Sequence, residues 1–250
     1  MAQNKIYIYG KHAVEEALRH APQVLRKIHI SARMDDKKLR ELINRSNVTV
    51  EPLDERKASS QVEGGVPHQG IIALISLASL TIPFEKFMDT FTASPDTVLL
   101  FLSEVQDPQN VGTAIRSAAA FGAMAVLMPV HKQAPITGAV IKASVGMAFR
   151  IPLVEVENMQ QAIANLKKKG VRVYGLSATV AHTVNKEEFK EPTLFVLGNE
   201  GSGIGPAARS VCDQLLSIPM SPRAESLNVA TSGAIALYAW SLKHPQALRE

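Results

Sequence analysis

The sequence has little of what several specialised classes of protein need. Cys212 is its only cysteine, so the chain can form neither an intrachain disulfide nor a cysteine cage for zinc. Fifteen glycines and fourteen prolines among 250 residues are too few for a collagen or a low-complexity chain. No apolar run approaches the ~18 residues of a membrane span, and the first residues lack the apolar core of a signal peptide. We therefore expect a soluble, cytoplasmic protein without a membrane partner.

The composition that remains is that of a globular protein with a small basic excess. Apolar residues make up 46% of the chain, and its length suits one large or two modest domains. The formal net charge is +4, and most of it lies before residue 78. A basic excess attracts polyanions such as nucleic acid, but many proteins carry a few extra positive charges for solubility alone. Charge leaves both interpretations open.

The first 77 residues read as a small α/β unit. Val14, Ala17 and Leu18 have the spacing of a helix that buries one face. Strands are expected at 6–9, 24–30, 48–50 and 71–75, and helices at 12–19 and 36–44, with Ser31 as a candidate cap. Residues 78–95 read as a linker that contains one short helix at 84–91, bracketed by two prolines.

Residues 96–250 repeat the alternation with longer apolar strands. Strands are expected at 98–102, 125–128, 151–154, 171–176, 194–197 and 215–218, and helices at 110–121, 141–144, 159–169 and 227–242. Strands that alternate with helices favour a parallel sheet with helices on both faces. The predicted fold class is therefore α/β, with three polar loops at the carboxyl ends of strands, where such sheets bind ligands.

The first polar loop spans residues 104–119. Asp107-Pro108 begins a turn, and Asn110 is a candidate cap for the helix that follows. The free N–H groups of a helix N-terminus suit a phosphate or another polar group. Arg116 follows one to two turns later, where it could face the same cleft as Asn110. The alternative is a capped helix that carries a surface arginine.

The second and third loops add a carboxylate and a second helix start. Residues 195–204 end an apolar strand in a glycine-rich loop that holds Glu200, and the pattern matches neither a dinucleotide fingerprint nor a P-loop. Residues 218–230 lead from a strand to the last helix, which either Ser226 or Asn228 opens. Each loop also fits a plain turn or cap. His131 and His182 have no further ligands at metal-binding spacing, so no metal is expected.

In this order and spacing, the three loops resemble the three motifs of the SpoU branch of the SPOUT RNA methyltransferases. The matching residues are Asp107-Pro108-x-Asn110-x-Gly112 with Arg116, then Gly198-Asn199-Glu200-Gly201-x-Gly203, then Ile218-Pro219-Met220 leading to Ser226-Leu227-Asn228-Val229. Tyr9-Gly10-x-His12-Ala13-Val14 and His68-Gln69-Gly70-Ile71-Ile72-Ala73 resemble the subgroup that methylates a guanosine ribose in large-subunit ribosomal RNA. The chain departs from the family at Ser221-Pro222, where a glycine-containing loop is usual, and at Ala230-Thr231, where Ser-Val is usual.

The resemblance implies a fold and a set of site residues. Residues 96–250 would form a SPOUT-type α/β domain with a trefoil knot, and residues 1–77 an RNA-binding domain similar to ribosomal protein L30e. S-adenosylmethionine would be the cofactor. Its pocket would be lined by Gly198, Ile218 and Leu227, with Leu197 and Gly203 beside them. The catalytic group would be Arg116 with Asn110, Glu200, Ser226 and Asn228 around it. Family enzymes are homodimers in which the arginine can serve the partner's cofactor pocket, so action of Arg116 in its own or in its partner's site stays open. An interface through the catalytic domain around residues 234–240 is expected.

The implied reaction is methyl transfer to a ribose 2′-hydroxyl, in ribosomal RNA or a ribosome assembly intermediate. Family proposals make Arg116 the base, but an arginine stays protonated below about pH 12. Clamping the adjacent phosphate, with Glu200 holding the guanidinium, is an equally physical role. One alternative is the same chemistry on transfer RNA, disfavoured because such enzymes often lack the N-terminal domain. The other is a catalytically silent RNA-binding paralogue, disfavoured by the retained polar residues.

Overall fold

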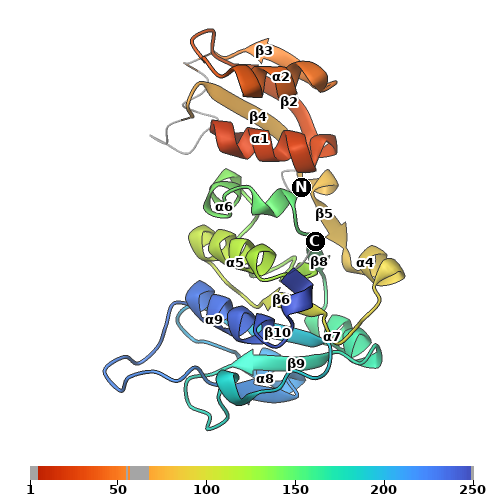
Figure 1. Cartoon of the computed structure of the whole chain (residues 1–250), viewed down its shortest axis with the longest axis vertical. Coiled ribbons are helices and arrows are strands. Elements are labelled where there is room, and N and C mark those ends of the chain that lie inside the picture. The colour runs from red at the N-terminus through yellow and green to blue at the C-terminus, as the bar shows by residue number, and fades with distance from the viewer. Residues whose placement is uncertain (1–4, 55, 57–67, 249–250) are drawn as a thin grey trace.

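The computed structural model describes residues 5–54, 56 and 68–248. Two α/β units follow one another along the long axis of the molecule, and the N-terminal unit forms one end (Figure 1). Within these described residues, no helix is long and apolar enough to cross a membrane.

The N-terminal unit contains a mixed four-stranded sheet. Its strands are β1 (Lys5–Tyr9), β2 (Leu25–Ile30), β3 (Thr49–Pro52) and β4 (Ile71–Ser76), in the order β1-β4-β2-β3. Only the β2–β3 pair is parallel. The helices are α1 (Lys11–His20), the 3₁₀ turn η1 (Pro22–Val24) and α2 (Lys37–Arg45). All four strands and both helices predicted for this unit are therefore confirmed, with ends shifted by a few residues.

The proposed cap of α2 was wrong. Asp36, and not Ser31, caps this helix, because its carboxylate accepts a hydrogen bond from Leu39 N at 3.1 Å. Ser31 Oγ instead accepts from Arg33 N, in the loop before the helix.

The segment predicted as a linker is built into the second sheet. After the turn η2 (Leu77–Ser79), β5 (Thr81–Pro83) pairs in parallel with β8 (Leu153–Val156). Helix α4 (Phe84–Thr90) then buries Phe84 and Phe87. A three-residue strand is too short to show an alternation, and its proline lies at the sheet edge, where the missing N–H costs little.

The C-terminal unit is built on a seven-stranded sheet in the order β11-β9-β10-β6-β7-β8-β5, parallel throughout. The other strands are β6 (Val98–Leu102), β7 (Ala125–Pro129), β9 (Arg172–Leu176), β10 (Thr193–Leu197) and β11 (Gln214–Leu216). The helices are α5 (Pro108–Ala120), α6 (Gly138–Ala143), α7 (Met159–Lys168), α8 (Pro206–Val211) and α9 (Val229–Ser241), with the turns η3 (Met147–Phe149), η4 (Val184–Lys186) and η5 (Pro245–Leu248). The predicted parallel α/β sheet is confirmed, but α8 was not anticipated.

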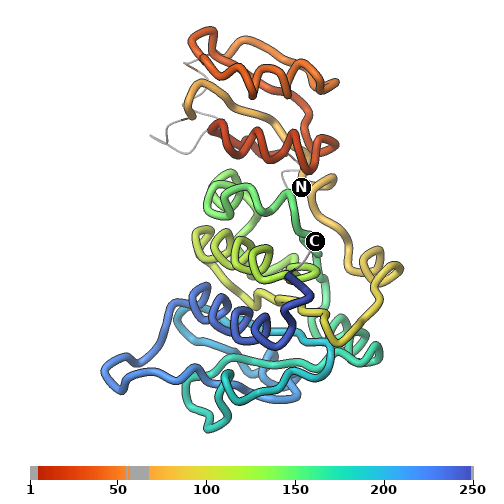
Figure 2. Tube along the Cα trace, viewed as in Figure 1, coloured from red at the N-terminus to blue at the C-terminus, as the bar shows by residue number. Residues whose placement is uncertain are grey.

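Helices cover both faces of this sheet. Residues of α5, α6 and α9 pack with one set of strand side chains, and residues of α4, α7 and α8 pack with the other. Every residue of β6 is fully buried, which explains its unbroken apolar sequence. Helices α5 and α9 are far apart in the sequence and run side by side (Figure 2).

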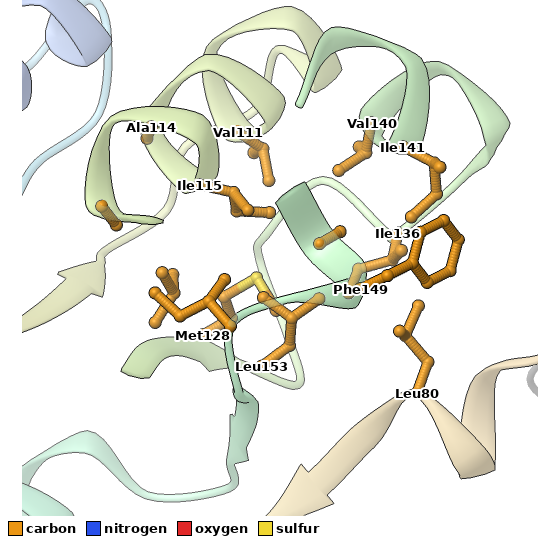
Figure 3. Close-up of a cluster of buried hydrophobic side chains, with 14 of the residues drawn as sticks. Leu80, Val111, Ala114, Ile115, Met128, Ile136, Val140, Ile141, Phe149 and Leu153 are labelled. Atoms are coloured by element: carbon orange, nitrogen blue, oxygen red, sulfur yellow. The ribbon is translucent and has the colours of Figure 1, made fainter. Parts of the chain in front are cut away.

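Two glycines allow the helices of the first face to pack closely. A Cβ on Gly112 of α5 would lie 2.7 Å from Val140 O of α6, and one on Gly233 of α9 would lie 2.6 Å from Leu197 Cδ1. Ile115 and Met128 lie in the core beneath α5 (Figure 3).

The prediction of an interface around residues 234–240 stays a prediction, but the structure shows which of these residues are accessible. Leu237 and Trp240 are fully buried inside the protomer. Exposed apolar surface comes from Tyr238, within the predicted range, which is 51% exposed, and from Leu242, just beyond it, which is 62% exposed. Helical periodicity accounts for the difference, because only one side of α9 faces away from the sheet.

Candidate functional site

The three polar loops meet at the carboxyl edge of the parallel sheet, and the Glu200 carboxylate joins them. Strand β10 ends directly before the loop that carries Glu200, beside the end of β6. Glu200 Oε1 accepts hydrogen bonds from Gln106 N at 3.1 Å, from Asp107 N at 3.0 Å and from Asn110 Nδ2 at 3.1 Å. One carboxylate therefore fixes the first turn of α5 and the loop before it.

Asn110 extends this network to the last helix. The prediction that it caps α5 was wrong: Asp107 is the cap, and its carboxylate accepts from Gln109 N at 2.9 Å. The Asn110 side chain is thereby free to donate to Glu200 and to accept from Asn228 Nδ2 at 2.8 Å. Asn228 also caps α9, accepting from the backbone N–H groups of residues 230 and 231 at 2.9 and 3.1 Å. Of the two candidate openers of α9, Asn228 is thus the one that caps it.

The donors around Glu200 also set its protonation. The surrounding loops partly shield the carboxyl from water, which alone would raise its pKa. Hydrogen bonds from Asp107 N, the Asn110 amide and Gln106 N act in the other direction and hold the pKa of Glu200 below its ordinary value. Glu200 is therefore a carboxylate at neutral pH, and its hydrogen-bonding capacity is largely used within the protein.

A cavity of about 400 Å³ lies beside this network, at the ends of β9, β10 and β11. All five residues predicted to bind the cofactor line it: Leu197, Gly198, Gly203, Ile218 and Leu227. Leu176 and Leu216 add to the apolar wall. A Cβ on Gly198 would collide with the main chain of Gly203, so the loop at the floor of the cavity closes only with glycine at position 198.

A second, more open cavity adjoins the first, and four of the five predicted catalytic residues line it: Asn110, Glu200, Ser226 and Asn228. Glu200 and Ser226 line both cavities. Within the part of the chain that the structure describes, the Ser226 hydroxyl makes no hydrogen bond, unlike the other three side chains.

Within one protomer, Arg116 does not join this group and does not face the same cleft as Asn110, so its predicted catalytic role remains untested. Its side chain is exposed, lines neither cavity and has no hydrogen bond or ion pair among the described residues. Glu200 holds Asn110 and main-chain N–H groups and not the guanidinium. Six residues of α-helix correspond to about 600°, so Arg116 lies roughly 120° around α5 from Asn110.

Sequence reasoning missed several residues of the site. Asn199 Oδ1 accepts from Gly201 N at 2.9 Å, and Asn199 Nδ2 donates to Glu104 O at 2.9 Å, which braces the glycine-rich loop. Ser177 and Thr179 line the first cavity from the loop after β9. Their place directly after a parallel strand was a signal that could have found them.

Comparison with known proteins assigns the chain to a family. Residues 97–238 match the family model described as the SpoU rRNA Methylase family. The chain belongs to the SpoU rRNA methylase family. Residues 7–80 match a second model, described as RNA 2′-O ribose methyltransferase substrate binding. The SpoU family assignment therefore accounts for both units of the structure.

Curated relatives match this SpoU chain over almost its whole length. The 23S rRNA (guanosine-2′-O-)-methyltransferase RlmB of Pseudomonas syringae pv. tomato is 33% identical over 236 residues, covering 92% of this chain and 93% of the relative. The protein of the same name from Haemophilus influenzae is also 33% identical, covering 92% and 95%.

Solved structures confirm the SPOUT-type fold class. The SpoU methyltransferase AviRb from Streptomyces viridochromogenes, in complex with AdoMet, superposes with a TM-score of 0.84 at 23% identity, covering 97% of this chain and 91% of that one. A TrmH/SpoU tRNA modifying enzyme from A. aeolicus reaches a TM-score of 0.54 and covers only 65% of this chain.

Proposed function

We propose that this SpoU protein transfers a methyl group from S-adenosylmethionine to the ribose 2′-hydroxyl of a guanosine in 23S ribosomal RNA. The observation that carries the proposal is the pairing of the two cavities. One is lined by the five residues expected at a cofactor, and the other by the polar network that joins the three family motifs. The curated relatives with this function match both units.

The first cavity fits the cofactor in size and chemistry. A volume of about 400 Å³ is within the range of small-molecule sites. Leu197, Ile218 and Leu227 offer an apolar wall for an adenine ring, and Gly198 permits close approach of main-chain groups that can read the ring edge. When bound, S-adenosylmethionine supplies a methyl group activated by its sulfonium. The residues of the second cavity would then meet the RNA ribose.

Glu200 serves as a positioning residue in this proposal. A lowered pKa makes its carboxylate a weak base, and its N–H donors leave little room for a substrate proton. It holds the loop before α5 against the glycine-rich loop. The hydrogen bonds from Asn110 to Glu200 and from Asn228 to Asn110 connect both loops to the start of α9. Ser226 has an uncommitted hydroxyl at the boundary of both cavities and would contact the ribose.

Arg116 remains the proposed partner of an RNA phosphate. A guanidinium stays charged at neutral pH and binds phosphate through two parallel hydrogen bonds. Because it is exposed and lines neither cavity of its own protomer, it would act on RNA that crosses α5, or beside the cavity of a second copy. The 2′-hydroxyl proton would leave to the phosphate or to water.

A homodimer through the C-terminal unit is part of the same proposal. Tyr238 and Leu242 expose apolar surface on and after α9, and the Tyr238 ring lies 5.8 Å from that of Phe121 at the end of α5. Such surface is covered in many proteins by a second molecule. Burial of this surface by a second copy would bring two Arg116-bearing helices together.

The experiment uses labelled S-adenosylmethionine and bacterial RNA that lacks ribose methylation. The RNA is separated by size, and the labelled ribose is mapped. Label on a guanosine of 23S RNA is expected. Label in transfer RNA would support the methyl-transfer reaction but refute ribosomal RNA as the substrate. No label on RNA or on ribosome precursors, with RNA binding intact, would favour a silent binder.

Arg116→Ala tests the catalytic assignment in the same assay. It should abolish transfer and leave cofactor affinity unchanged, because Arg116 lines neither cavity. Lys168→Ala is the matched control, since it removes one exposed positive charge from α7 on the other face of the sheet. Full activity of the Arg116 variant would refute the assignment.

A further inference from the structure

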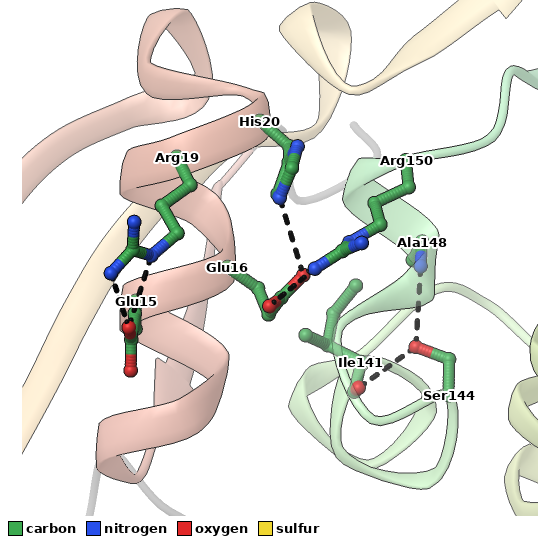
Figure 4. A network of polar contacts seen from close by, with 8 residues as sticks. All are labelled: Glu15, Glu16, Arg19, His20, Ile141, Ser144, Ala148 and Arg150. Atoms are coloured by element: carbon green, nitrogen blue, oxygen red, sulfur yellow. Dashed lines mark hydrogen bonds and ion pairs between the residues drawn. The ribbon is translucent and has the colours of Figure 1, made fainter. Parts of the chain in front are cut away.

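An ion pair between buried Glu16 and partly exposed Arg150 joins the two units of the chain. Glu16 of α1 is only 4% exposed, and its two oxygens accept from Arg150 Nε at 2.6 Å and from Arg150 Nη2 at 2.9 Å. Arg150 follows η3 in the C-terminal unit, so the bond spans 134 positions of sequence. His20 Nε2 lies 3.8 Å from the same carboxylate (Figure 4).

The geometry of this pair restricts rotation as well as distance. Two parallel hydrogen bonds to a planar guanidinium fix the relative orientation of the groups they join. The hydrogen bond from Arg150 is the largest reason why the pKa of Glu16 is lowered, although burial acts against it. Separation of the units would break both of these charge-assisted hydrogen bonds, so the pair opposes it.

Glycines on the C-terminal unit receive the N-terminal unit at very close range. Gly146 has a φ of 75°, and a Cβ there would lie 2.6 Å from Glu16 Cγ. A Cβ on Gly138, the first residue of α6, would lie 2.5 Å from Tyr7 O of β1. Lys142 of the same helix places its ammonium 5.7 Å from the centre of the Tyr9 ring. At Gly138 and Gly146 the two units therefore approach more closely than any residue with a Cβ would allow.

Apolar packing continues through the same junction. Leu80, Ile136 and Phe149 belong to one buried cluster (Figure 3), and that cluster includes core residues of both units. Ile8 and Val14 of the N-terminal unit are fully buried in it. The two units therefore share one hydrophobic core and do not pack as separate domains.

The junction connects directly to the helix that carries the site. Helix α6 lies between α1 and α5 in the fold (Figure 1). Gly112 of α5 packs against α6 as closely as a glycine allows, and Asn110, two residues earlier, binds Glu200. Closely packed elements of this kind transmit displacement because they have little free volume.

We propose that the Glu16–Arg150 pair and the contacts around it hold the substrate-binding unit at one fixed position relative to the cofactor cavity, and that this fixed span selects which nucleotide of a bound RNA is methylated. Glu16 and Arg150 are then positioning and specificity-determining residues that never touch the reacting atoms. The proposal rests on the methyltransferase function proposed above.

Two variants open the junction in independent ways. Glu16→Ala removes the ion pair, and Gly138→Ala inserts a methyl group against Tyr7 O without altering any charge. Glu15→Ala is the matched control, because Glu15 pairs with Arg19 at 2.8 Å on the exposed side of the same helix (Figure 4). Cofactor affinity, the map of methylated nucleotides and the distance between the units are measured for each.

The distance is measured by pulsed electron resonance between spin labels at Arg45→Cys in α2 and Lys168→Cys in α7, in a Cys212→Ala background. The parent protein and Glu15→Ala should give one narrow distance distribution. Glu16→Ala and Gly138→Ala should broaden it. They should also spread methylation to neighbouring nucleotides and slow transfer at the normal target by about tenfold to 100-fold, since a misplacement of about 1 Å has such effects, with cofactor affinity unchanged.

Three results would overturn the proposal. A narrow distribution and an unchanged product map in both variants would show that the junction does not set the span. Loss of cofactor affinity would show that the contacts support the C-terminal unit itself. A broadened distance distribution with an unchanged map of methylated nucleotides would show that the fixed span does not select the target nucleotide. If the parent protein methylated no RNA, the methyltransferase proposal would fail, and a narrow parent distribution that broadens in the variants would still establish the fixed span.

Discussion

Asn110→Asp should reverse the way stability depends on pH. The substitution keeps the shape of the side chain and replaces the amide that donates to Glu200 Oε1 at 3.1 Å with a carboxylate oxygen. The oxygen that accepts from Asn228 can stay in place. A hydrogen bond to a charged group contributes roughly 1.5–3 kcal/mol. Repulsion between the two carboxylates adds to this loss, although solvent screens the repulsion. We therefore expect the variant to be destabilised by about 3 kcal/mol at neutral pH.

The sign of the pH effect follows from the two pKa shifts. In the parent protein the pKa of Glu200 is lowered, so its contribution is present at neutral pH and is lost as the pH falls below the ordinary value of 4.5 and through the lower folded pKa. In the variant, two carboxyls share one site, and one of them acquires a raised pKa. The variant therefore recovers stability as the pH falls through that raised value.

Thermal unfolding between pH 5 and 8 measures this difference. For a chain of this length, about 3 kcal/mol corresponds to a fall in Tm on the order of 6–12 °C. The deficit should be greatest near pH 8 and shrink toward pH 5. Asn44→Asp, at an exposed position of α2, adds the same charge elsewhere and should change Tm little at either pH. A deficit that does not depend on pH would refute the Asn110–Glu200 contact.

Three further substitutions or reactions test other parts of the structure. Gly198→Ala should abolish cofactor binding in calorimetry, because its Cβ collides with the main chain of Gly203, while the N-terminal unit stays folded by NMR; retained affinity would contradict the placement of the cavity. Gly112→Ala should lower the free energy of unfolding in urea by about 1–3 kcal/mol through overpacking against α6, and a neutral effect would show that α5 and α6 can separate. Burial raises the pKa of the Cys212 thiol to about 11, so alkylation at pH 8 should be about 100-fold slower in the folded protein than in urea. Equal rates would mean that the thiol is accessible.

The sequence was most informative where one local property decides the structure. Strand β6 is a continuous apolar run, β10 is one after Thr193, and the structure buries each from both faces. Strand β5 and helix α8 span three and six residues, too few to show a period. Their formation depends on neighbours that are distant in the sequence.

The site also combines features that a local sequence pattern indicates with contacts that no local pattern indicates. The glycine-rich loop and the helix start at Asn228 were visible as local patterns, whereas the partners of Glu200 lie about 90 positions earlier and carry no local sign of the contact. The family resemblance grouped Glu200 with Asn110, but it led us to expect the Arg116 guanidinium as the partner of Glu200. The position of Arg116 is a different case, because helical geometry alone places it roughly 120° around α5 from Asn110.

The order of the cavity walls along the chain has a consequence for synthesis. The walls of the cofactor cavity come from residues 176–232, and the cap that starts α9 is Asn228. Chains fold from the N-terminus as they emerge from the ribosome. The substrate-binding unit and most of the large sheet can therefore fold while the cavity is still open on one side. The cavity is therefore complete only when α9 has packed against β10 and α5, after nearly all of the chain has been made.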